Sequence, residues 1–145
     1  MSISGGCLCG AVRYDIDAEL TELGACHCQM CRRWSGGIYL SVKADESEVT
    51  LTGQADIGTY KSSDWAERGF CKTCGSSVYY RVTLAGPYQG NYHFAAGTLD
   101  DASGLTLNSQ MFIDQKPSGY AFTQETQDLT TKEIEAMFAD VAAQT

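Results

Sequence analysis

Three cysteines within six residues, Cys26, Cys28 and Cys31, form the densest group of metal-ligating side chains in the sequence. A C-x-C motif that continues into a C-x-x-C motif places three sulfurs on one short loop, where they can converge on a single ion. Zinc takes four tetrahedral ligands in a structural site, but three protein ligands and a water or substrate in a catalytic site. The group therefore predicts a catalytic zinc site with an open fourth position.

Two arginines, Arg32 and Arg33, follow the third cysteine directly. Three thiolates around a dication leave about one negative charge, which a neighbouring cation would offset. A guanidinium group also matches a carboxylate through two parallel N–H bonds. We expect Arg32 and Arg33 to offset this charge or to bind the carboxylates of a substrate. The alternative is that they are solvated or paired with surface acids.

The other four cysteines form two pairs, Cys7 with Cys9 and Cys71 with Cys74, which are more than sixty residues apart. A C-x-C and a distant C-x-x-C predict a closed four-sulfur zinc site that is structural, because its binding free energy is coupled to folding. Sulfurs on one zinc lie about 3.8 Å apart, so the backbone must curl, which the flanking glycines permit. This gives two zinc ions per chain. Spacing alone leaves three alternatives open. The central three cysteines could recruit a fourth from elsewhere, a single metal could bind and leave the other thiols free, or the cysteines could ligate an iron–sulfur cluster.

Composition narrows the class of protein. A chain of 145 residues is long enough for one domain with its own core, and we expect residues 1–145 to form a single zinc-binding domain. Ten basic residues against eighteen acidic ones, a formal charge of −8, disfavour nucleic acid as a partner. Seven cysteines without a secretion signal disfavour a disulfide framework. No run of apolar residues suits a membrane, and we expect a cytoplasmic protein.

The elements that position these motifs are mostly short strands. Alternating apolar and polar residues predict strands near 12–16, 38–42, 49–52, 57–61, 78–82, 92–96 and 110–114. The segment 34–37 is predicted to be a turn after the cysteine group. Short strands at near-regular spacing favour a mainly β, mainly antiparallel domain.

The end of the chain is predicted to be a helix over about 131–143. Thr130 and Glu133 match a capping box, and Leu129 and Ile134 are spaced to form a hydrophobic staple. The apolar stripe of this helix consists of Ile134, Met137, Phe138 and Val141. We expect it to pack on the sheet or on a second subunit, which would make a homodimer.

The motifs GGCLCGAVRY, CHCQMCRRWSG, RGFCKTCGS and AAGTLDD, in this order and at these separations, resemble the glutathione-dependent formaldehyde-activating enzyme family, whose domain is shared with centromere protein V. The resemblance covers about residues 5–116 and leaves out the terminal helix. It implies a twisted antiparallel β-tent fold built around a structural zinc. By position it assigns the structural zinc and the catalytic zinc to the same two groups of cysteines as the spacing does.

The family's activity is the condensation of formaldehyde with glutathione to S-hydroxymethylglutathione, a carbon–sulfur lyase reaction run in reverse. The resemblance therefore implies a zinc-dependent lyase that acts on a glutathione adduct or on another small-thiol adduct. A non-catalytic zinc module that binds glutathione or a protein partner is the alternative. This sequence departs from the family pattern at Gln110, where a histidine is common, and near Gly119, where a bulky aromatic is common. Both departures are expected to lie away from the metal ligands.

Several other polar residues receive a structural interpretation. His27 is expected to point away from the metal although it lies between ligands, and His93 to be a surface or core histidine rather than an acid or base. Asp100 and Asp101 are typical of a turn. The tyrosines expected to pack the sheet are Tyr79, Tyr80, Tyr88 and Tyr92.

Overall fold

A computed structural model describes residues 2–143, and in this range the chain forms eleven strands and two α-helices. In chain order these are β1 (Ile3–Gly6), β2 (Arg13–Ile16), β3 (Glu22–Cys26), α1 (Gln29–Ser35), β4 (Tyr39–Ala44), β5 (Val49–Thr52), β6 (Ile57–Ser63), β7 (Ala66–Cys71), β8 (Ser77–Val82), β9 (Tyr92–Ala95), β10 (Thr106–Met111), β11 (Gln127–Leu129) and α2 (Thr131–Ala143). The expected mainly β fold with a C-terminal helix is confirmed. No helix in this part of the chain is both long enough and apolar enough to cross a membrane.

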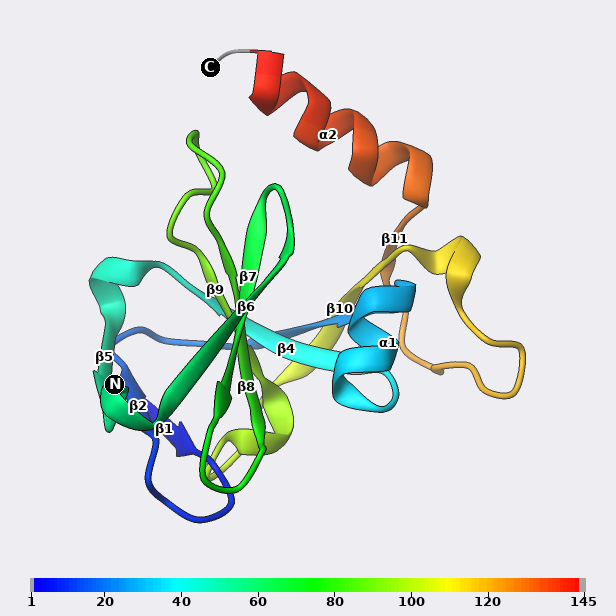
Figure 1. The fold of residues 1–145 in the computed structure, drawn as a ribbon. Coiled ribbons are helices and arrows are strands. Elements are labelled where there is room, and N and C mark those ends of the chain that lie inside the picture. Colours follow the sequence, from blue (N-terminus) through cyan, green and yellow to red (C-terminus); the bar gives the residue numbers. More distant parts are fainter. Residues whose placement is uncertain (1, 144–145) are drawn as a thin grey trace.

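The strands form two sheets (Figure 1). The smaller sheet has the order β1-β2-β5 and is antiparallel. The larger has the order β11-β10-β3-β4-β9-β8-β7-β6. Its pairs are antiparallel except that β10 runs parallel to both β3 and β11. Because β10 and β3 are parallel, they end at the same edge of the sheet, with Met111 paired to Cys26. This places the segment after β10 beside the loop that carries the three clustered cysteines.

The main core lies between the two sheets. Tyr14 of β2 stacks on Phe94 of β9 with ring centroids 4.0 Å apart. Val12, Ile16 and Val42 are fully buried in the same cluster. The cluster also contains two cysteines from the distant pairs, Cys7 and Cys71. The four-cysteine group is therefore continuous with the apolar core.

Two local predictions were wrong. The segment 34–37 was expected to be a turn, but its first two residues complete α1, which ends at Ser35. The C-cap, Gly36, adopts the left-handed conformation with φ of 85°. The last strand was expected over 110–114, but β10 ends at Met111 because Phe112 adopts φ of 56° and a short 3₁₀ turn follows. A left-handed residue interrupts strand geometry, and an aromatic side chain gives no sequence signal for it.

The C-terminal helix begins as predicted. Thr130 and Glu133 form the reciprocal capping contacts, with the Glu133 N–H donating to the Thr130 hydroxyl at 3.3 Å and the Thr130 N–H donating to the Glu133 carboxylate at 3.4 Å. Ile134 is buried. Phe138 stacks on Trp65, in the turn between β6 and β7, at a centroid distance of 5.5 Å. The helix thus packs on its own chain, across the end of the β6–β7 hairpin (Figure 1).

The fourth member of the predicted apolar stripe, Val141, has a side chain outside the described residues. A homodimer stays a prediction.

Candidate metal centres

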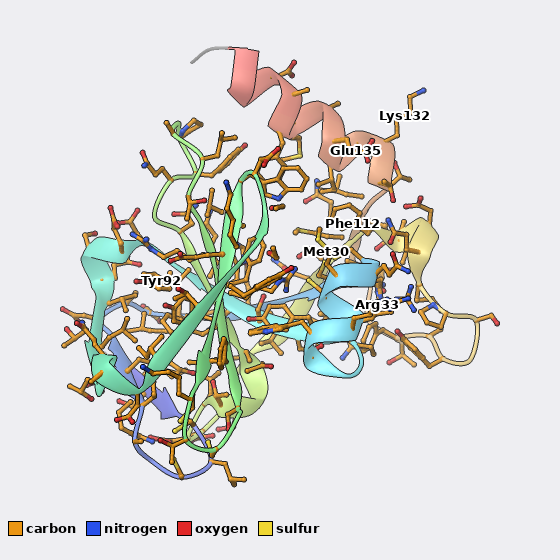
Figure 2. The ribbon with its side chains drawn as sticks, viewed as in Figure 1. Met30, Arg33, Tyr92, Phe112, Lys132 and Glu135 are labelled. Carbon is orange, nitrogen blue, oxygen red and sulfur yellow. The ribbon has the colours of Figure 1, made fainter. Side chains whose placement is uncertain are left out.

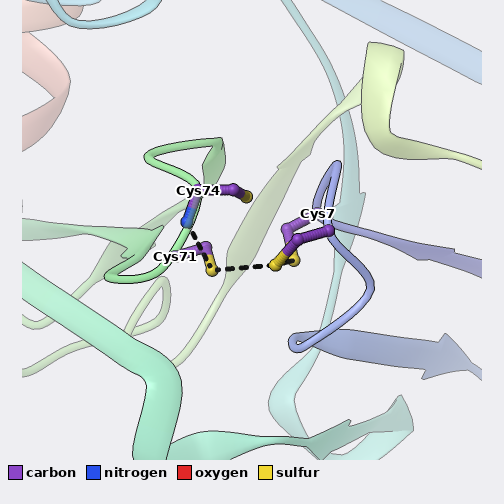
Figure 3. A group of neighbouring side chains, drawn as sticks. Cys7, Cys71 and Cys74 are labelled. Atoms are coloured by element: carbon purple, nitrogen blue, oxygen red, sulfur yellow. Dashed lines mark hydrogen bonds between the residues drawn. The ribbon is translucent and has the colours of Figure 1, made fainter.

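The first group of cysteines joins two turns from distant parts of the chain (Figure 3). Cys7 and Cys9 lie in the turn between β1 and β2, and their sulfurs are 3.7 Å apart. Cys71 ends β7 and Cys74 lies in the turn between β7 and β8, and the Cys71 sulfur is 3.8 Å from that of Cys9. All four sulfurs lie within 4.8 Å of one another. Sulfurs on a tetrahedral zinc are about 3.8 Å apart, so the four residues fit a closed site.

Backbone amides of the same turns point at the sulfurs. The Val12 N–H donates to the Cys7 sulfur at 3.2 Å, and the Cys74 N–H to the Cys71 sulfur at 3.5 Å. A hydrogen bond from the Ser76 hydroxyl lowers the pKa of Cys74 to about 5. These donors stabilise thiolates, the form in which cysteine binds a metal. The donor set and its surroundings therefore suit zinc.

The second group, which we call the trio, consists of Cys26, Cys28 and Cys31. Cys26 ends β3, Cys28 is the N-cap of α1, and Cys31 lies in the first turn of α1. The Cys31 N–H donates to the Cys28 sulfur at 3.3 Å, so the start of the helix brings two of the sulfurs together. All three sulfurs lie within 4.8 Å of one another, and no further Cys, His, Asp or Glu among the described residues belongs to this group.

The trio is nearly buried and is separate from the main core. Its cysteines are 9%, 6% and 4% exposed in chain order, and they cluster with Tyr39, Trp34 and Tyr80. Crowding of the three thiols raises the pKa of Cys26, through its hydrogen bond to Cys28, and the same contact lowers the pKa of Cys28. One sulfur of the group therefore carries negative charge readily even before an ion binds.

The cysteines thus assemble as the spacing predicts, in one group of four and one of three. None of the seven cysteines forms a disulfide. The donor set of each group suits zinc or another metal that prefers sulfur.

Sequence analysis missed the cation that contacts the trio, Arg68 of β7. Its two terminal nitrogens donate to the Cys31 sulfur at 3.4 and 3.5 Å. Its guanidinium lies over the rings of Trp34 and Tyr80, at 5.2 and 5.1 Å from their centroids. Burial opposes the charge, but the Cys31 sulfur raises the pKa of Arg68 above its ordinary value. The residue is only 2% exposed. Its place in the RGFCKTCGS motif was the only sequence signal.

Arg32 and Arg33, the two arginines that sequence analysis selected, lie at a hollow outside the trio. The hollow, of about 330 Å³, lies between the end of α1 and the loop after β10, and Pro117 and Tyr120 also contribute to it. Figure 2 shows Arg33 on the side of α1 that faces this loop. The Arg32 Nε donates to the carbonyl oxygen of His27 at 3.1 Å. Neither arginine forms an ion pair within residues 2–143.

His27 anchors the trio loop to β10. It is fully buried, and its Nε2 lies 2.8 Å from the Gln110 side-chain oxygen, while its Nδ1 lies 3.4 Å from the Tyr120 hydroxyl. The Gln110 amide nitrogen donates to the Thr126 hydroxyl at 2.9 Å. This leaves the Gln110 oxygen to accept from His27. Both ring nitrogens are therefore engaged away from the trio, as expected.

The two departures from the family pattern differ in their surroundings. Gln110 was expected to lie away from the metal ligands, but its side chain contacts the residue between Cys26 and Cys28. Pairing of β10 with β3 brings it there. Gly119 has open space where a side chain would begin, since no atom lies within 4 Å of an added Cβ. A larger residue would therefore fit beside the hollow lined by Arg32 and Arg33.

The remaining polar candidates have structural surroundings. His93 packs edge-on against Tyr80, and burial lowers its pKa to about 4. Asp100 pairs with Arg13, and Asp101 accepts the Ser103 N–H at 2.9 Å, which is a turn interaction. Two of the four tyrosines, Tyr79 and Tyr92, pack around Phe94 as expected. The others do not belong to that core, because Tyr80 lies beside Arg68 and Tyr88 packs on Phe138.

Fold and sites together define a mainly β protein with two groups of cysteines that suit metal ions, one of four sulfurs and one of three. The sequence profile described as glutathione-dependent formaldehyde-activating enzyme matches residues 2–115. The chain belongs to this family, which is a family of enzymes.

Two curated relatives have similar names. The chain is 31% identical over 130 residues to an uncharacterized lyase of Schizosaccharomyces pombe, an alignment that covers 90% of this chain and 92% of that protein. It is 35% identical over 89 residues to a protein of Halomonas elongata whose name places it among glutathione-dependent formaldehyde-activating enzymes. That second alignment covers 54% of this chain and 55% of the relative.

Proposed function

We propose that this protein is a zinc-dependent carbon–sulfur lyase that acts on an adduct of glutathione or of another small thiol. The reaction that the family name supports is the formation of S-hydroxymethylglutathione from formaldehyde and glutathione. The observation that carries the proposal is the trio, because three convergent sulfurs without a fourth ligand among the described residues match a catalytic donor set. The proposal includes two zinc ions per chain, a structural one at Cys7, Cys9, Cys71 and Cys74 and a catalytic one at the trio.

Zinc held by the trio would supply Lewis acidity and favour the thiolate form of a bound thiol. In the condensation, the thiol sulfur forms a bond to the formaldehyde carbon, the carbonyl π bond breaks, and the thiol proton ends on the former carbonyl oxygen. Buried Tyr39 and partly buried Trp34 pack against the trio and limit the water that would compete for this position.

The hollow beside α1 suits the rest of a glutathione molecule. Glutathione carries two carboxylates, and Arg32 and Arg33 are two cations without acidic partners within the described residues of a chain whose formal charge is −8. A guanidinium fork binds a carboxylate in two parallel hydrogen bonds. Arg32 also touches the loop between the ligands through the His27 carbonyl, so the hollow and the trio share one wall. Binding at the hollow would therefore hold the thiol end near the trio.

The test is the exchange between ¹³C-formaldehyde, glutathione and their adduct, followed by NMR with and without the protein. The parent is expected to accelerate exchange, and Cys28→Ser to remove the acceleration. Arg33→Gln is expected to weaken glutathione binding about tenfold, the loss of one charged hydrogen-bonding partner. The matched control is Lys132→Gln on α2, which replaces an exposed cation outside the hollow and should bind as the parent does.

An unchanged exchange rate together with tight glutathione binding would reject the enzyme and establish the non-catalytic zinc module. If the protein neither accelerates exchange nor binds glutathione, glutathione is rejected as the ligand. Location in the cytoplasm stays a prediction.

A further inference from the structure

We propose that Arg68 is the positioning residue of the trio: it holds the Cys31 sulfur and cancels the negative charge that three thiolates leave around a dication, so that the site accepts an anionic substrate. This inference rests on the proposed function for its substrate. Its structural part does not, because it concerns contacts between Arg68 and one sulfur.

The contact has a defined geometry. Both terminal nitrogens of Arg68 reach the same atom, the Cys31 sulfur, at 3.4 and 3.5 Å. These nearly equal distances place the sulfur about midway between the two terminal nitrogens of the guanidinium. Trp34 and Tyr80 lie against the guanidinium at 5.2 and 5.1 Å, which restricts its rotation. The sulfur is therefore held from one direction by a planar group that cannot turn away.

The unsatisfied nitrogen points to the same conclusion. The Arg68 Nε is buried without a hydrogen-bond partner in the described residues. A buried unpaired donor is unfavourable, so another interaction must compensate for it. The contacts with the Cys31 sulfur and the two aromatic rings are the ones present. Among the described residues, the Cys31 sulfur is the hydrogen-bond partner of the Arg68 side chain, and no backbone or carboxylate oxygen accepts from it.

Charge makes the contact relevant to substrate. Arginine is always protonated in proteins, and a buried guanidinium needs a negative partner. The ion pairs found in residues 2–143 involve Arg13 and Arg81 with acids, and none involves Arg68. Three thiolates, a dication and Arg68 sum to zero, whereas the same site without Arg68 would carry one negative charge. An anionic thiol substrate would then be repelled.

This function differs from that of Arg32 and Arg33. Those residues line the hollow and are placed for carboxylates at the far end of a substrate. Arg68 lies on β7 and contacts Cys31 and Trp34, neither of which lines the hollow, and no residue of the hollow contacts it among the interactions found. The charge at the trio and the binding of the substrate's carboxylates are therefore assigned to different arginines.

The test compares Arg68→Met, which keeps an unbranched chain between the rings, and Arg68→Lys, which keeps the charge without the fork. Arg81→Met is the matched control, because Arg81 also stacks on a tyrosine of the same sheet, Tyr92, at 5.2 Å, and also has a buried unpartnered Nε. Each protein is loaded with one zinc per chain at the four-cysteine group and then with Co²⁺ at the trio. The sulfur-to-cobalt charge-transfer band and the affinity for glutathione are then measured.

Arg68→Met is expected to shift the band to longer wavelength, because N–H bonds to a thiolate lower the energy of its electrons. It is also expected to weaken glutathione binding by a factor on the order of ten to a hundred, the effect of one unit charge a few ångströms away. Arg68→Lys should show the band shift with binding within about threefold of the parent, since the charge remains. Arg81→Met should change neither quantity.

A folded Arg68→Met protein with the parent's band and the parent's glutathione affinity would overturn the inference. If this variant does not fold, the test rests on Arg68→Lys. A charge-transfer band at the parent's position in Arg68→Lys would overturn the proposed contact between the two guanidinium nitrogens and the Cys31 sulfur. Failure of the parent itself to bind glutathione would refute the proposed function instead. The band shift would still report whether Arg68 holds the Cys31 sulfur.

Discussion

Replacing one cysteine in each group should affect metal content and stability very differently. The sulfurs of Cys71 and Cys74 join the turn after β7 to the turn after β1, and Cys71 is fully buried in the main core. The trio lies on one short loop and belongs to a separate cluster. We therefore expect Cys74→Ser to prevent folding and Cys28→Ser to leave a folded protein with one ion fewer.

The magnitudes follow from these placements. A structural zinc contributes roughly 10 kcal/mol or more to folding, whereas a domain is stable by only about 5–15 kcal/mol. Losing the ion at the four-cysteine group therefore removes most or all of the stability. In the trio, Cys28 caps α1 by accepting the Cys31 N–H. Serine is itself a preferred N-cap, so Cys28→Ser should cost about 1 kcal/mol or less at the helix start.

The assay combines metal analysis per chain with denaturant unfolding followed by circular dichroism. The expected result is two zinc ions for the parent, one for a folded Cys28→Ser protein, and an unfolded Cys74→Ser protein that keeps none. Loss of fold in both variants would refute the assignment of the trio as an open site. A Cys74→Ser protein as stable as the parent would refute the structural role of the four-cysteine group.

Two further predictions concern stability. Phe138→Ala should destabilise the protein by about 1–2 kcal/mol, because half-buried aromatic area and its stacking on Trp65 are lost. The fluorescence of Trp65 should shift to longer wavelength. Met137→Ala, on the exposed side of α2, is the control. An unchanged Trp65 spectrum would contradict the packing of α2. Burial lowers the pKa of His93 to about 4, against 6.5 in the unfolded state. Below pH 6.5 the unfolded state therefore binds a proton that the folded state does not. The contribution of His93 to stability is full above pH 6.5 and falls as the pH drops toward 4. The loss between pH 7 and pH 4.5 should be about 2 kcal/mol, measured by urea unfolding as the difference between the parent and His93→Gln. Equal pH slopes for the two proteins would show that His93 is not buried in its neutral form.

Features of the fold that depend on neighbouring residues could be predicted from the sequence. The capping box of α2 forms between Thr130 and Glu133 because its partners are three residues apart. The trio forms because its sulfurs share one loop and one helix start. The four-cysteine group could also be predicted, although its two pairs are far apart in the sequence. Its cysteines have the spacing of two metal-binding pairs, and the donor chemistry of sulfur leaves few ways to combine them.

Other features depend on which strands become neighbours. Gln110 meets His27, 83 residues away, only because β10 pairs in parallel with β3. No periodicity in the sequence distinguishes this pairing from an antiparallel one, since alternation is the same in both. The early end of β10 is similar, because Phe112, a residue type that rarely adopts the left-handed conformation, does so where it packs against the trio.

The spacing of seven cysteines was therefore enough to predict the two groups of sulfurs that the structure brings together, because most of the cysteines in each group are close in the sequence. The mainly β frame was predicted from the alternation of apolar and polar residues. Only the tertiary structure identified the cation of the trio. Sequence proximity pointed to Arg32 and Arg33, but the guanidinium that contacts a sulfur comes from Arg68, 37 residues from Cys31. Electrostatic interactions act through space, and distance in space is decided by how β7 and α1 pack around Trp34.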